Sequence, residues 1–166
     1  MLGWDISMEA DGGEALLTPV TGDFTFTARV SGVPTHPDGS DADEWAKSGI
    51  IMRETPLAES RYVGMFMTPQ HGLRSAHRRM FNTGQTWDNG SSNTPDLPAY
   101  LRIQRRGTVL SVFTSTDGTT FTPNGDVETV DFADLPATVY VGFAGTAGGV
   151  QLPITQEKFD QVTLGP

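Results

Sequence analysis

The stretch from residue 100 to residue 121 restricts the fold of this chain more than any other part of the sequence. In its first half Leu101 and Ile103 alternate with Tyr100, Arg102 and Gln104, and in its second half Leu110 and Val112 alternate with Val109, Ser111 and Phe113. Alternation with a period of two places one set of side chains on each face of an extended strand. The pattern therefore predicts two half-buried strands whose apolar faces are formed by Leu101, Ile103, Leu110 and Val112.

Two glycines divide this stretch into strands that follow one another directly. Gly107 follows Arg106, and Gly118 follows Asp117. Glycine adopts positive backbone dihedral angles without steric cost, so both dipeptides suit the tight turns of antiparallel hairpins. Residues 119–121 are β-branched or aromatic and are predicted to form a third strand. The whole stretch is expected to be an antiparallel meander.

The remainder of the chain contains similar short runs and almost no helical pattern. Glycine (19) and proline (11) recur throughout, and only residues 41–47 have the composition of a capped helical turn. Strands without intervening helices favour two packed sheets. We expect residues 1–166 to form one all-β domain, a two-sheet antiparallel β-sandwich with little helix. Further strands are predicted at residues 24–30, 49–53, 62–68, 72–81, 138–144 and 158–164.

The composition excludes several classes of protein and of site. Cysteine is absent, which excludes disulfides, thiolate metal sites and a cysteine nucleophile. No apolar run reaches the roughly 20 residues of a transmembrane helix, and the first residues lack the basic and apolar regions of a signal peptide. We therefore expect a soluble chain, which fits an intracellular protein, a mature secreted module or one domain of a longer protein.

Seven segments, in chain order, carry a resemblance to a known family. They are GDFTFTARV (22–30), EWAKSGIIMRE (44–54), SRYVGMFMTPQHG (60–72), YLRIQRRG (100–107), FTSTDGTTFT (113–122), YVGFAGTA (140–147) and KFDQVTL (158–164). Together they resemble the bacterial concanavalin-like jelly-roll domains, which are related to laminin-G and glucanase domains. The resemblance implies one concave and one convex sheet, in secreted or cell-surface proteins. Some members of this group bind glycans, others are glycosidases, and many have no assigned activity.

The acidic residues that glucanases of this fold use are missing from the predicted strands. Those enzymes carry paired carboxylates on one strand, in patterns such as ExDxxE, as nucleophile and acid. The acidic cluster at residues 41–44 lies in a predicted loop instead. His36, His71 and His77 lack the sequence context of a nucleophilic serine. The sequence therefore predicts that the protein is not an enzyme, with a glycoside hydrolase or lyase as the third alternative.

Positive charge is concentrated in the middle of a strongly acidic chain. The net charge is -9, yet residues 45–106 hold nine of the eleven basic residues and only four acidic ones. Eight of those nine are arginines, whose planar guanidinium groups bind carboxylates, phosphates and pairs of sugar hydroxyls. The overall acidity disfavours nucleic acid as a partner.

Strand parity indicates where some of these arginines point. Arg102 lies opposite the apolar side chains of its own strand, so its guanidinium is predicted on an outer face of the sandwich. We hypothesise that Arg53 and Arg78 share this face. With Tyr62 or Phe66 beside them, they would form a cationic and aromatic floor for a ligand. The alternative is that the arginines pair with acids from the acidic flanks of the chain.

Two long irregular segments, residues 32–44 and 84–98, are further candidates for a binding site, although long loops are as often plain surface loops. Trp87 lies in the second one among small polar residues, where it would stack on a sugar ring or, alternatively, anchor the loop. Trp45 is expected to pack at the start of a strand. The predicted ligand-binding residues are Arg53, Tyr62, Arg78, Trp87, Arg102 and Gln104.

Sandwich domains often bind a structural calcium ion through several carboxylate and carbonyl oxygens. The candidate ligands here are scattered, and none of them forms a loop of the DxDxDG type. The sequence therefore predicts no metal site and no cofactor. The candidates are Asp23, Asp160 and the loop acids Asp38, Asp41 and Asp43.

The predicted function is non-catalytic binding of a carbohydrate or another surface through the concave sheet and adjacent loops. The expected partner is a glycan or a cell-surface polymer, with self-assembly or contact to neighbouring domains as further interactions. The expected location is secreted or at the cell surface. An alternative from a different class is a structural or assembly protein, such as a subunit of a virion or a cell-surface layer.

Overall fold

The computed structural model describes residues 5–6, 9–87, 96–124, 129–149, 153–155 and 158–166. These residues form strands, turns and bends without any helix, so the expected all-β class is confirmed. Residues 44–45 form a turn rather than the expected turn of helix. The strands are β1 (Glu14–Thr21), β2 (Phe24–Val30), β3 (Lys47–Arg53), β4 (Tyr62–Thr68), β5 (Gly72–Arg78), β6 (Thr86–Trp87), β7 (Ala99–Arg106), β8 (Val109–Ser115), β9 (Thr122–Pro123), β10 (Thr129–Asp131), β11 (Thr138–Thr146) and β12 (Phe159–Gly165).

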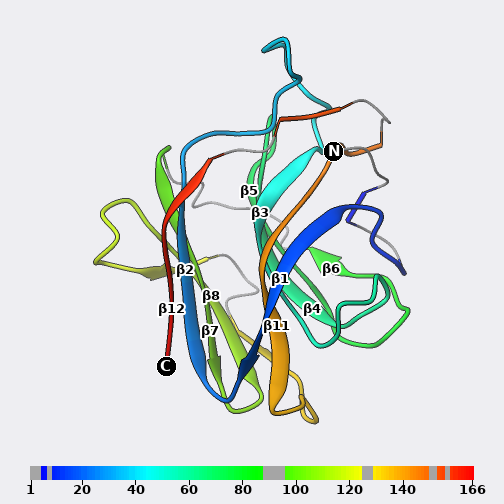
Figure 1. Ribbon diagram of the computed structural model, residues 1–166, viewed down its shortest axis with the longest axis vertical. Coiled ribbons are helices and arrows are strands. Elements are labelled where there is room, and N and C mark those ends of the chain that lie inside the picture. The colour runs from blue at the N-terminus through cyan, green and yellow to red at the C-terminus, as the bar shows by residue number, and fades with distance from the viewer. Residues whose placement is uncertain (1–4, 7–8, 88–95, 125–128, 150–152, 156–157) are drawn as a thin grey trace.

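Two antiparallel sheets face each other, as the expected sandwich requires (Figure 1). Sheet A has the strand order β1-β11-β3-β4-β5-β6, and sheet B has the order β10-β8-β7-β2-β12, with the short β9 paired to β8. Consecutive strands such as β2 and β3, or β11 and β12, belong to different sheets, so the chain crosses repeatedly between the layers. This arrangement is a sandwich of the jelly-roll type. Across the described residues, we find no helix long and apolar enough to cross a membrane.

The predicted meander is present, but its third strand is displaced. Strands β7 and β8 pair along their whole length, and Gly107 and Gly118 have φ angles of 62° and 74°, as their turns require. Residues 119–121 are not a strand, because the Asp117 carboxylate accepts the backbone N–H groups of Thr119 and Thr120 at 2.7 Å each. These bonds hold the chain in a turn, so pairing resumes only at β9.

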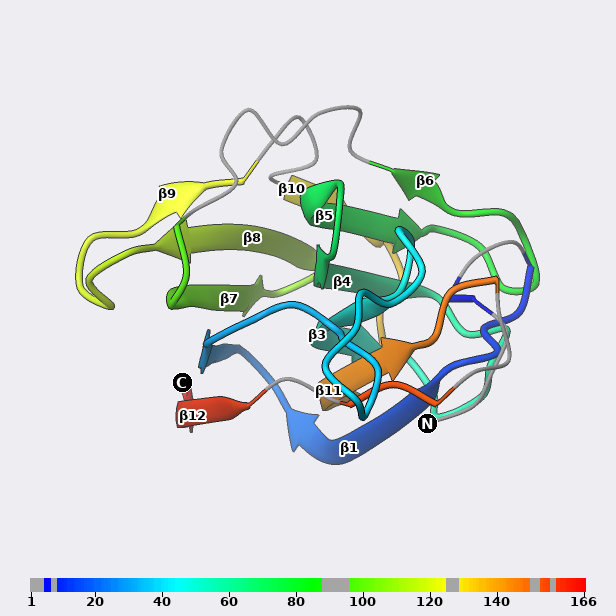
Figure 2. The ribbon, with the colours of Figure 1, turned by 90° about the horizontal axis from the view of Figure 1, so that it is seen from above.

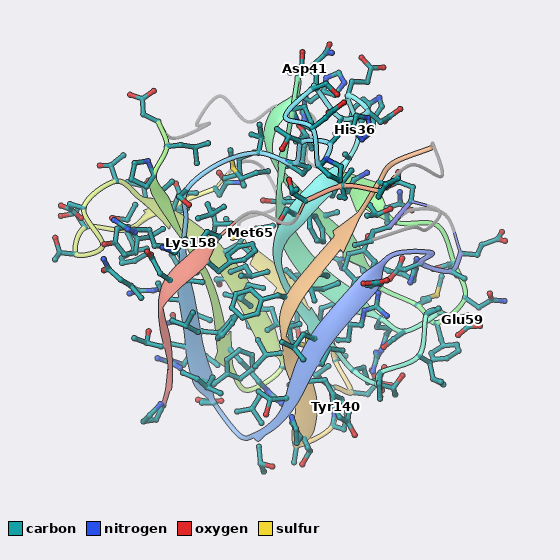
Figure 3. All side chains as sticks on the ribbon, turned by 45° about the horizontal axis from the view of Figure 1, so that its top comes forward. His36, Asp41, Glu59, Met65, Tyr140 and Lys158 are labelled. Carbon is teal, nitrogen blue, oxygen red and sulfur yellow. The ribbon has the colours of Figure 1, made fainter. Side chains whose placement is uncertain are left out.

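The core lies between the two sheets and uses the side chains that strand parity indicated. Leu101, Ile103, Leu110 and Val112 are all buried, and Ile103 lies opposite Val112 in the ladder. Met65 lies in the interior between the layers (Figure 3). Burial of each such side chain stabilises the fold by about 1.5 to 3 kcal/mol. The inward faces of both sheets are therefore used for packing, and only their outer faces can present a binding surface.

Three strands lack a recognisable pattern in the sequence, and β1 is the longest of them. Strand β1 is an edge strand of sheet A that includes Pro19, and most of its residues are exposed, so no apolar period is visible. At the opposite layer, edge strand β12 pairs with β2 in a register that shifts between Asp160 and Thr163. Gln161, inside this irregularity, has a φ of 48°. On this side of the sandwich, β1 therefore pairs continuously but lacks one backbone donor at Pro19, whereas β12 has an irregular register.

A second, smaller apolar cluster lies on the outer face of sheet A. An outer sheet face is usually polar, but here apolar side chains from four strands are buried against Ile6, which is 0% exposed. The chain before β1 therefore covers part of this face. The buried members from the strands are Ile51, Tyr62, Phe66, Ala76 and Ala144.

Candidate functional site

Three of the predicted ligand residues lie side by side on the outer face of sheet A. Arg53 ends β3, Tyr62 begins β4 and Arg78 ends β5, and the register pairs Arg53 with Tyr62 and Tyr62 with Arg78. The guanidinium carbon of Arg78 lies 5.0 Å from the centroid of the Tyr62 ring. Phe66, four residues further along β4, points to the same face. The hypothesised cationic and aromatic floor therefore exists on sheet A.

This floor is closed to solvent by the N-terminal segment, which we define as residues 5–6 and 9–13. Tyr62 and Arg78 are 0% exposed, and Arg53 is 5% exposed. Figure 2 shows the chain that leads to β1 running along the side of sheet A that faces away from sheet B. A ligand cannot reach these three side chains unless the N-terminal segment moves.

Asp11 of the N-terminal segment joins the two arginines. Its Oδ1 accepts a hydrogen bond from Arg78 Nη2 at 2.7 Å, and its Oδ2 accepts one from Arg53 Nη2 at 2.5 Å. Burial raises the pKa of Asp11 and lowers the pKa of Arg53, and the opposite charges counteract both shifts. One carboxylate is therefore held between two guanidinium groups, away from water.

The same arginines also hold the connections around the floor. Arg78 donates to the carbonyl oxygens of Ala58, Ser60 and Thr83 at 2.8 to 3.0 Å. Arg53 donates to the carbonyl of the neighbouring loop residue 57 at 3.1 Å. Guanidinium groups that bind several carbonyls and a carboxylate are structural as well as charged. The alternative expectation, in which the arginines of residues 45–106 pair with acids from the flanks, is confirmed for this pair and for the Arg61–Asp134 pair.

Two donors within the floor lack an acceptor. Tyr62 Oη and Arg53 Nε have no hydrogen-bond partner among the described residues, although both atoms are buried. Burial raises the pKa of Tyr62 above its usual value, so the hydroxyl stays protonated and remains a donor. Buried donors are normally paired, because an unpaired one loses its bonds to water without replacement. The floor therefore offers more donors than Asp11 uses.

A second acid of the N-terminal segment pairs with a second cation of sheet A. Asp5 Oδ1 accepts a hydrogen bond from Lys47 Nζ at 2.5 Å, and Lys47 is 0% exposed. Lys47 and Arg53 both lie on β3 and, six residues apart, point to the same face. Between these two contacts, Ile6 packs onto the small apolar cluster. The N-terminal segment thus follows the face of the sheet and places one acid at Lys47 and another between Arg53 and Arg78.

An aromatic platform lies at the end of this face. Trp45, just before β3, stacks on His71, which lies in the turn between β4 and β5, with ring centroids 3.7 Å apart and an interplanar angle of 20°. Trp45 is 39% exposed, so the stack is open to solvent. Glu44 lies 3.6 Å from His71 Nε2. Trp45 packs at the start of a strand, as expected, and it also forms a surface on which a ring can stack.

Arg102 and Gln104 lie on the opposite side of the molecule, on the outer face of sheet B. Arg102 is therefore separate from Arg53 and Arg78, and the hypothesis that all three share one face is wrong. The reason is that β7 belongs to sheet B, whereas β3 and β5 belong to sheet A. Parity within each strand was sufficient to predict an outer face but not which of the two outer faces.

The Arg102 side chain is held in a defined position. Its Nε donates to the Thr27 hydroxyl at 3.0 Å, and its guanidinium carbon lies 3.3 Å from the centroid of the Phe121 ring. Among the described residues, its two terminal nitrogens have no hydrogen-bond partner. Two positions along β7, Gln104 Nε2 donates to the Thr25 hydroxyl at 3.2 Å. Both side chains are half-buried and are supported from β2.

Trp87 lies in β6, at the edge of sheet A, where it is opposite Ala76 of β5. The structure describes its backbone, and its side chain lies outside the described part. Its proposed stacking on a ligand therefore stays a prediction. The rest of its loop, residues 88–95, is likewise outside the described residues.

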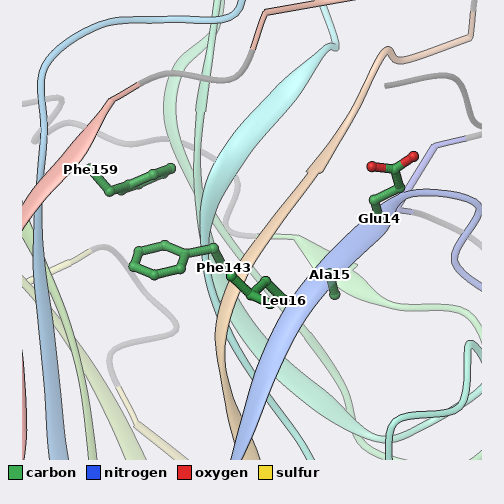
Figure 4. A pocket seen from close by; sticks show the side chains of 5 residues that line it. All are labelled: Glu14, Ala15, Leu16, Phe143 and Phe159. Carbon is green, nitrogen blue, oxygen red and sulfur yellow. The ribbon is translucent and has the colours of Figure 1, made fainter.

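A separate apolar hollow opens where β1 and β11 meet β12. It has a volume of about 310 Å³ and is lined by Leu16, Phe143 and Phe159, with Glu14 and Ala15 at its rim (Figure 4). The Phe143 and Phe159 ring centroids are 4.7 Å apart. The hollow shares none of the predicted ligand residues. Self-assembly, a further interaction expected from the sequence, stays a prediction.

Four of the five acids considered as calcium ligands, all except Asp41, have other partners. Asp23 accepts the backbone N–H of Gly107, Asp160 pairs with Arg29, and Asp38 accepts two hydrogen bonds from Ser40. Asp43 accepts the backbone N–H of residue 45 at the start of β3. Across the described ranges, three or more His, Asp or Glu side chains do not gather in a metal-binding group.

The sequence analysis missed the residues that complete the floor, namely Asp5, Ile6 and Asp11. The sequence does contain a signal for them. Near the N-terminal end, Asp5 and Asp11 flank the apolar Ile6, and basic residues are concentrated in the strands that follow. The interpretation considered that segment only as a missing signal peptide. It also missed Phe121 as the support for Arg102, because residues 119–121 were expected to be a strand.

The comparisons with known proteins concern the fold. No protein-family model matches this sequence, and no curated protein does. A solved structure of a functionally unknown protein from Saccharomyces cerevisiae is similar, with a TM-score of 0.69 and 18% identity, covering 99% of this chain and 83% of that one. The alginate lyase from Klebsiella pneumoniae has a TM-score of 0.51 at 18% identity, and the match covers 87% of this chain and 60% of the lyase.

These similarities correct one expectation. The sequence analysis concluded that the protein is not an enzyme, because paired catalytic carboxylates are missing. The similar alginate lyase shows that this fold supports a lyase, and the missing glucanase pattern therefore does not exclude an enzyme. The similarity to an all-β sandwich is shown, while a specific concanavalin-like family is not.

Proposed function

We propose that the protein binds an acidic polysaccharide on the outer face of sheet B. The observation that carries this proposal is the arrangement of Arg102, which is fixed by Thr27 and Phe121 while two of its nitrogens have no partner among the described residues. A guanidinium group held in this way loses little conformational freedom when a ligand binds. Its planar donor geometry matches a carboxylate or a sulfate.

Gln104 adds an acceptor beside this donor. Its Nε2 is used by Thr25, and its Oε1 has no partner within the described part of the chain. Residues two apart on a strand lie about 6.5 Å from each other on the same face. The pair of Arg102 and Gln104 thus offers donors and an acceptor at the separation that groups of one sugar unit span.

The charge of this face favours an anionic polymer over a neutral one. In the described part of the chain, no carboxylate lies at ion-pair distance from Arg102 or Arg106, whereas Arg29 on the same face is neutralised by Asp160. Two uncompensated cations on one strand of a protein with a net charge of -9 form a local attractive site. This function implies a secreted or cell-surface location.

The test is binding of polygalacturonate, with methyl-esterified polygalacturonate and dextran as uncharged comparisons, by isothermal titration calorimetry. Arg102→Ala should weaken polygalacturonate binding by about tenfold, as the loss of a hydrogen bond to a charged group predicts. The matched control is Arg79→Ala, which removes the same charge from an exposed position just after β5 and should leave the affinity unchanged. A folded Arg102→Ala protein with full affinity contradicts the proposal.

A second candidate function, a polysaccharide lyase, is favoured by the floor on sheet A. A lyase removes a proton next to the carboxylate of a sugar, and the carbon–oxygen bond to the next sugar breaks as a double bond forms. Arg53 and Arg78 already hold a carboxylate, and the Tyr62 hydroxyl has no partner among the described residues. This hydroxyl can pass its own proton to the leaving oxygen and accept the proton from the sugar carbon, so that it is protonated again at the end of the step. The similar fold of the alginate lyase supports this candidate.

The lyase candidate has its own measurement. Cleavage by elimination creates an unsaturated product whose ultraviolet absorbance increases with time. Tyr62→Phe should abolish this increase and leave polymer binding on sheet B intact. Unchanged absorbance with alginate, polygalacturonate and hyaluronate, for the wild-type protein and for the Asp11→Asn variant described below, removes this candidate.

A further inference from the structure

The carboxylate of Asp11 is bound in the way that proteins bind a carboxylate ligand. Each of its oxygens accepts a hydrogen bond from a different arginine, at 2.7 and 2.5 Å, on a floor of Tyr62 and Phe66. Two guanidinium groups on one carboxylate form a strong and specific anion site. We propose that this floor is a binding site for a carboxylate-bearing polysaccharide, and that the N-terminal segment occupies it until an external carboxylate displaces Asp11.

The way in which the N-terminal segment is attached supports this proposal. The ladder between β1 and β11 begins only at Glu14, so residues 5–6 and 9–13 are not paired with the sheet. Asp11 N–H donates to the carbonyl of Ala58, and Gly12 N–H donates back to Asp5 within the segment itself. Among the described residues, the other contacts that attach this segment are made by side chains, including Asp5 to Lys47 and Asp11 to Arg53 and Arg78. A segment fixed by a few side chains opens at lower free energy than a strand within a sheet.

The unpartnered donors indicate that Asp11 fits the site incompletely. Tyr62 Oη and Arg53 Nε are buried and have no acceptor among the described residues. A sugar that carries a carboxylate also carries ring and hydroxyl oxygens close to it. These oxygens can accept from both donors, which a short aspartate side chain does not do. The floor is therefore better matched to an acidic sugar than to its present occupant.

Two further features favour a polymer of sugars over an isolated acid or a peptide. Lys47 repeats the pattern with Asp5, and the six residues that separate it from Arg53 on β3 correspond to roughly 20 Å. The exposed Trp45–His71 stack lies just beyond Lys47, whose Nζ is 5.8 Å from the Trp45 ring. Carboxylates repeated along a chain of flat rings match cations and a stacking platform in one row.

This site is distinct from the one proposed on sheet B, and the two fail separately. The binding experiment therefore uses the Arg102→Ala background, in which the sheet B site is weakened. Titration with polygalacturonate should show weak binding, because the site is occupied in most molecules. Asp11→Asn, which keeps the shape and removes the charge, should increase the affinity by about tenfold, since less of the protein is in the closed state.

The matched control is Asp38→Asn in the same background. It removes one acid from an exposed loop, where the carboxylate accepts hydrogen bonds from Ser40, so it changes the net charge equally without touching either proposed site. An equal gain in affinity from both variants overturns the proposal, since general charge would then explain the effect. Polyglutamate tests whether carboxylates on a peptide bind as well. If polyglutamate binds and polygalacturonate does not, the proposal of a sugar ligand is overturned.

A second measurement does not depend on whether the variant folds. Hydrogen exchange of the wild-type protein with saturating polygalacturonate should become faster at the Asp11 and Gly12 amides, while amides of β3 and β4 are protected. Ordinary binding elsewhere would leave Asp11 and Gly12 unchanged or slow them. Slower or unchanged exchange at these two amides overturns the displacement. Ile6→Ala, which loosens the segment without changing any charge, should also increase the affinity.

Discussion

The outer faces of the two sheets both carry arginines at alternate strand positions, yet they use them differently. On sheet A, Arg53 and Arg78 are buried and share the carboxylate of Asp11. On sheet B, Arg102 is half-buried, and two of its nitrogens are without a partner among the described residues. The difference arises from the covering chain, since only sheet A has the N-terminal segment across it. Whether an outward arginine is structural or available is decided by that cover and not by its strand.

The largest expected effect is on the stability of sheet A. Arg78→Met should lower the free energy of unfolding by about 3 to 5 kcal/mol, because it leaves Asp11 buried with one partner and three carbonyls without a donor. Urea denaturation measures this. Arg102→Met, the same substitution on sheet B, should change stability by less than about 1 kcal/mol. Equal losses for the two variants would show that the faces do not differ in the way described.

Acidification should affect sheet A before it affects sheet B. His77 of β5 is buried, and burial together with the nearby Arg79 lowers its pKa from 6.5 to about 4. A folded-state pKa below the unfolded value means that the neutral ring favours folding. The contribution is complete above pH 6.5 and is lost as the pH falls to about 4, which amounts to about 3 kcal/mol. His77→Gln should flatten the pH dependence of urea unfolding in this window.

Two acids, Asp11 and Asp160, also contribute to the pH dependence of stability. Asp11, whose pKa is raised by burial, acts in the opposite direction, because its protonation favours the folded state as the pH falls. The difference between wild type and His77→Gln isolates the histidine. On sheet B, the hydrogen bond from Arg29 lowers the pKa of Asp160, so that contribution is present above pH 3.8 and is lost below it. A wild-type curve that matches His77→Gln between neutral pH and pH 4 refutes the assignment.

A smaller effect is expected for the support of Arg102. Phe121→Ala removes the ring beneath the guanidinium group, an interaction of about 1 kcal/mol at a partly exposed site. Polygalacturonate affinity should fall by about fivefold through the freer arginine, with the midpoint of urea unfolding nearly constant. Phe121→Tyr keeps the ring and serves as the control. Loss of affinity in both variants would mean that the ring itself contacts the polymer.

The smallest effect is expected for the ion pair on sheet B. A double-mutant cycle with Arg29→Ala and Asp160→Ala should give a coupling energy close to the error of measurement, because both side chains are about 30% exposed and water screens the pair. The corresponding cycle with Arg78→Met and Asp11→Ala should give a large coupling energy. A sheet B coupling as large as that of sheet A would contradict the comparison between the two faces.

Much of the fold could be predicted from the sequence, because the alternation of side chains is a local property. The burial of Leu101 and Ile103 and the outward direction of Arg102 follow from parity alone. The displaced strand at residues 119–121 could not be predicted, since the Asp117 side chain holds a turn that competes with pairing. The strand propensity of residues 119–121 takes no account of these side-chain hydrogen bonds.

The candidate site was predictable only in part, for a similar reason. Arg53, Tyr62 and Arg78 were selected for their chemistry. Each of them lies on the outward-facing side of its own strand, so their grouping on one floor could be predicted from the sequence. The contact with Asp11 joins residues 42 positions apart through a segment without any repeating pattern. Which sheet a strand joins also depends on contacts between distant residues. For this reason Arg102 was wrongly grouped with Arg53 and Arg78.

The two edge strands beside the apolar hollow bear on how the protein behaves at high concentration. Leu16, Val162 and Leu164 are more than 40% exposed there, on two edge strands that another chain could extend into a larger sheet. Pro19 lacks the backbone donor that an added strand needs, and the bend at Gln161 breaks the row of acceptors on the other edge. The missing donor at Pro19 and the bend at Gln161 therefore protect these exposed apolar edge strands against fibril-like aggregation. Replacing Pro19 or straightening β12 would remove that protection.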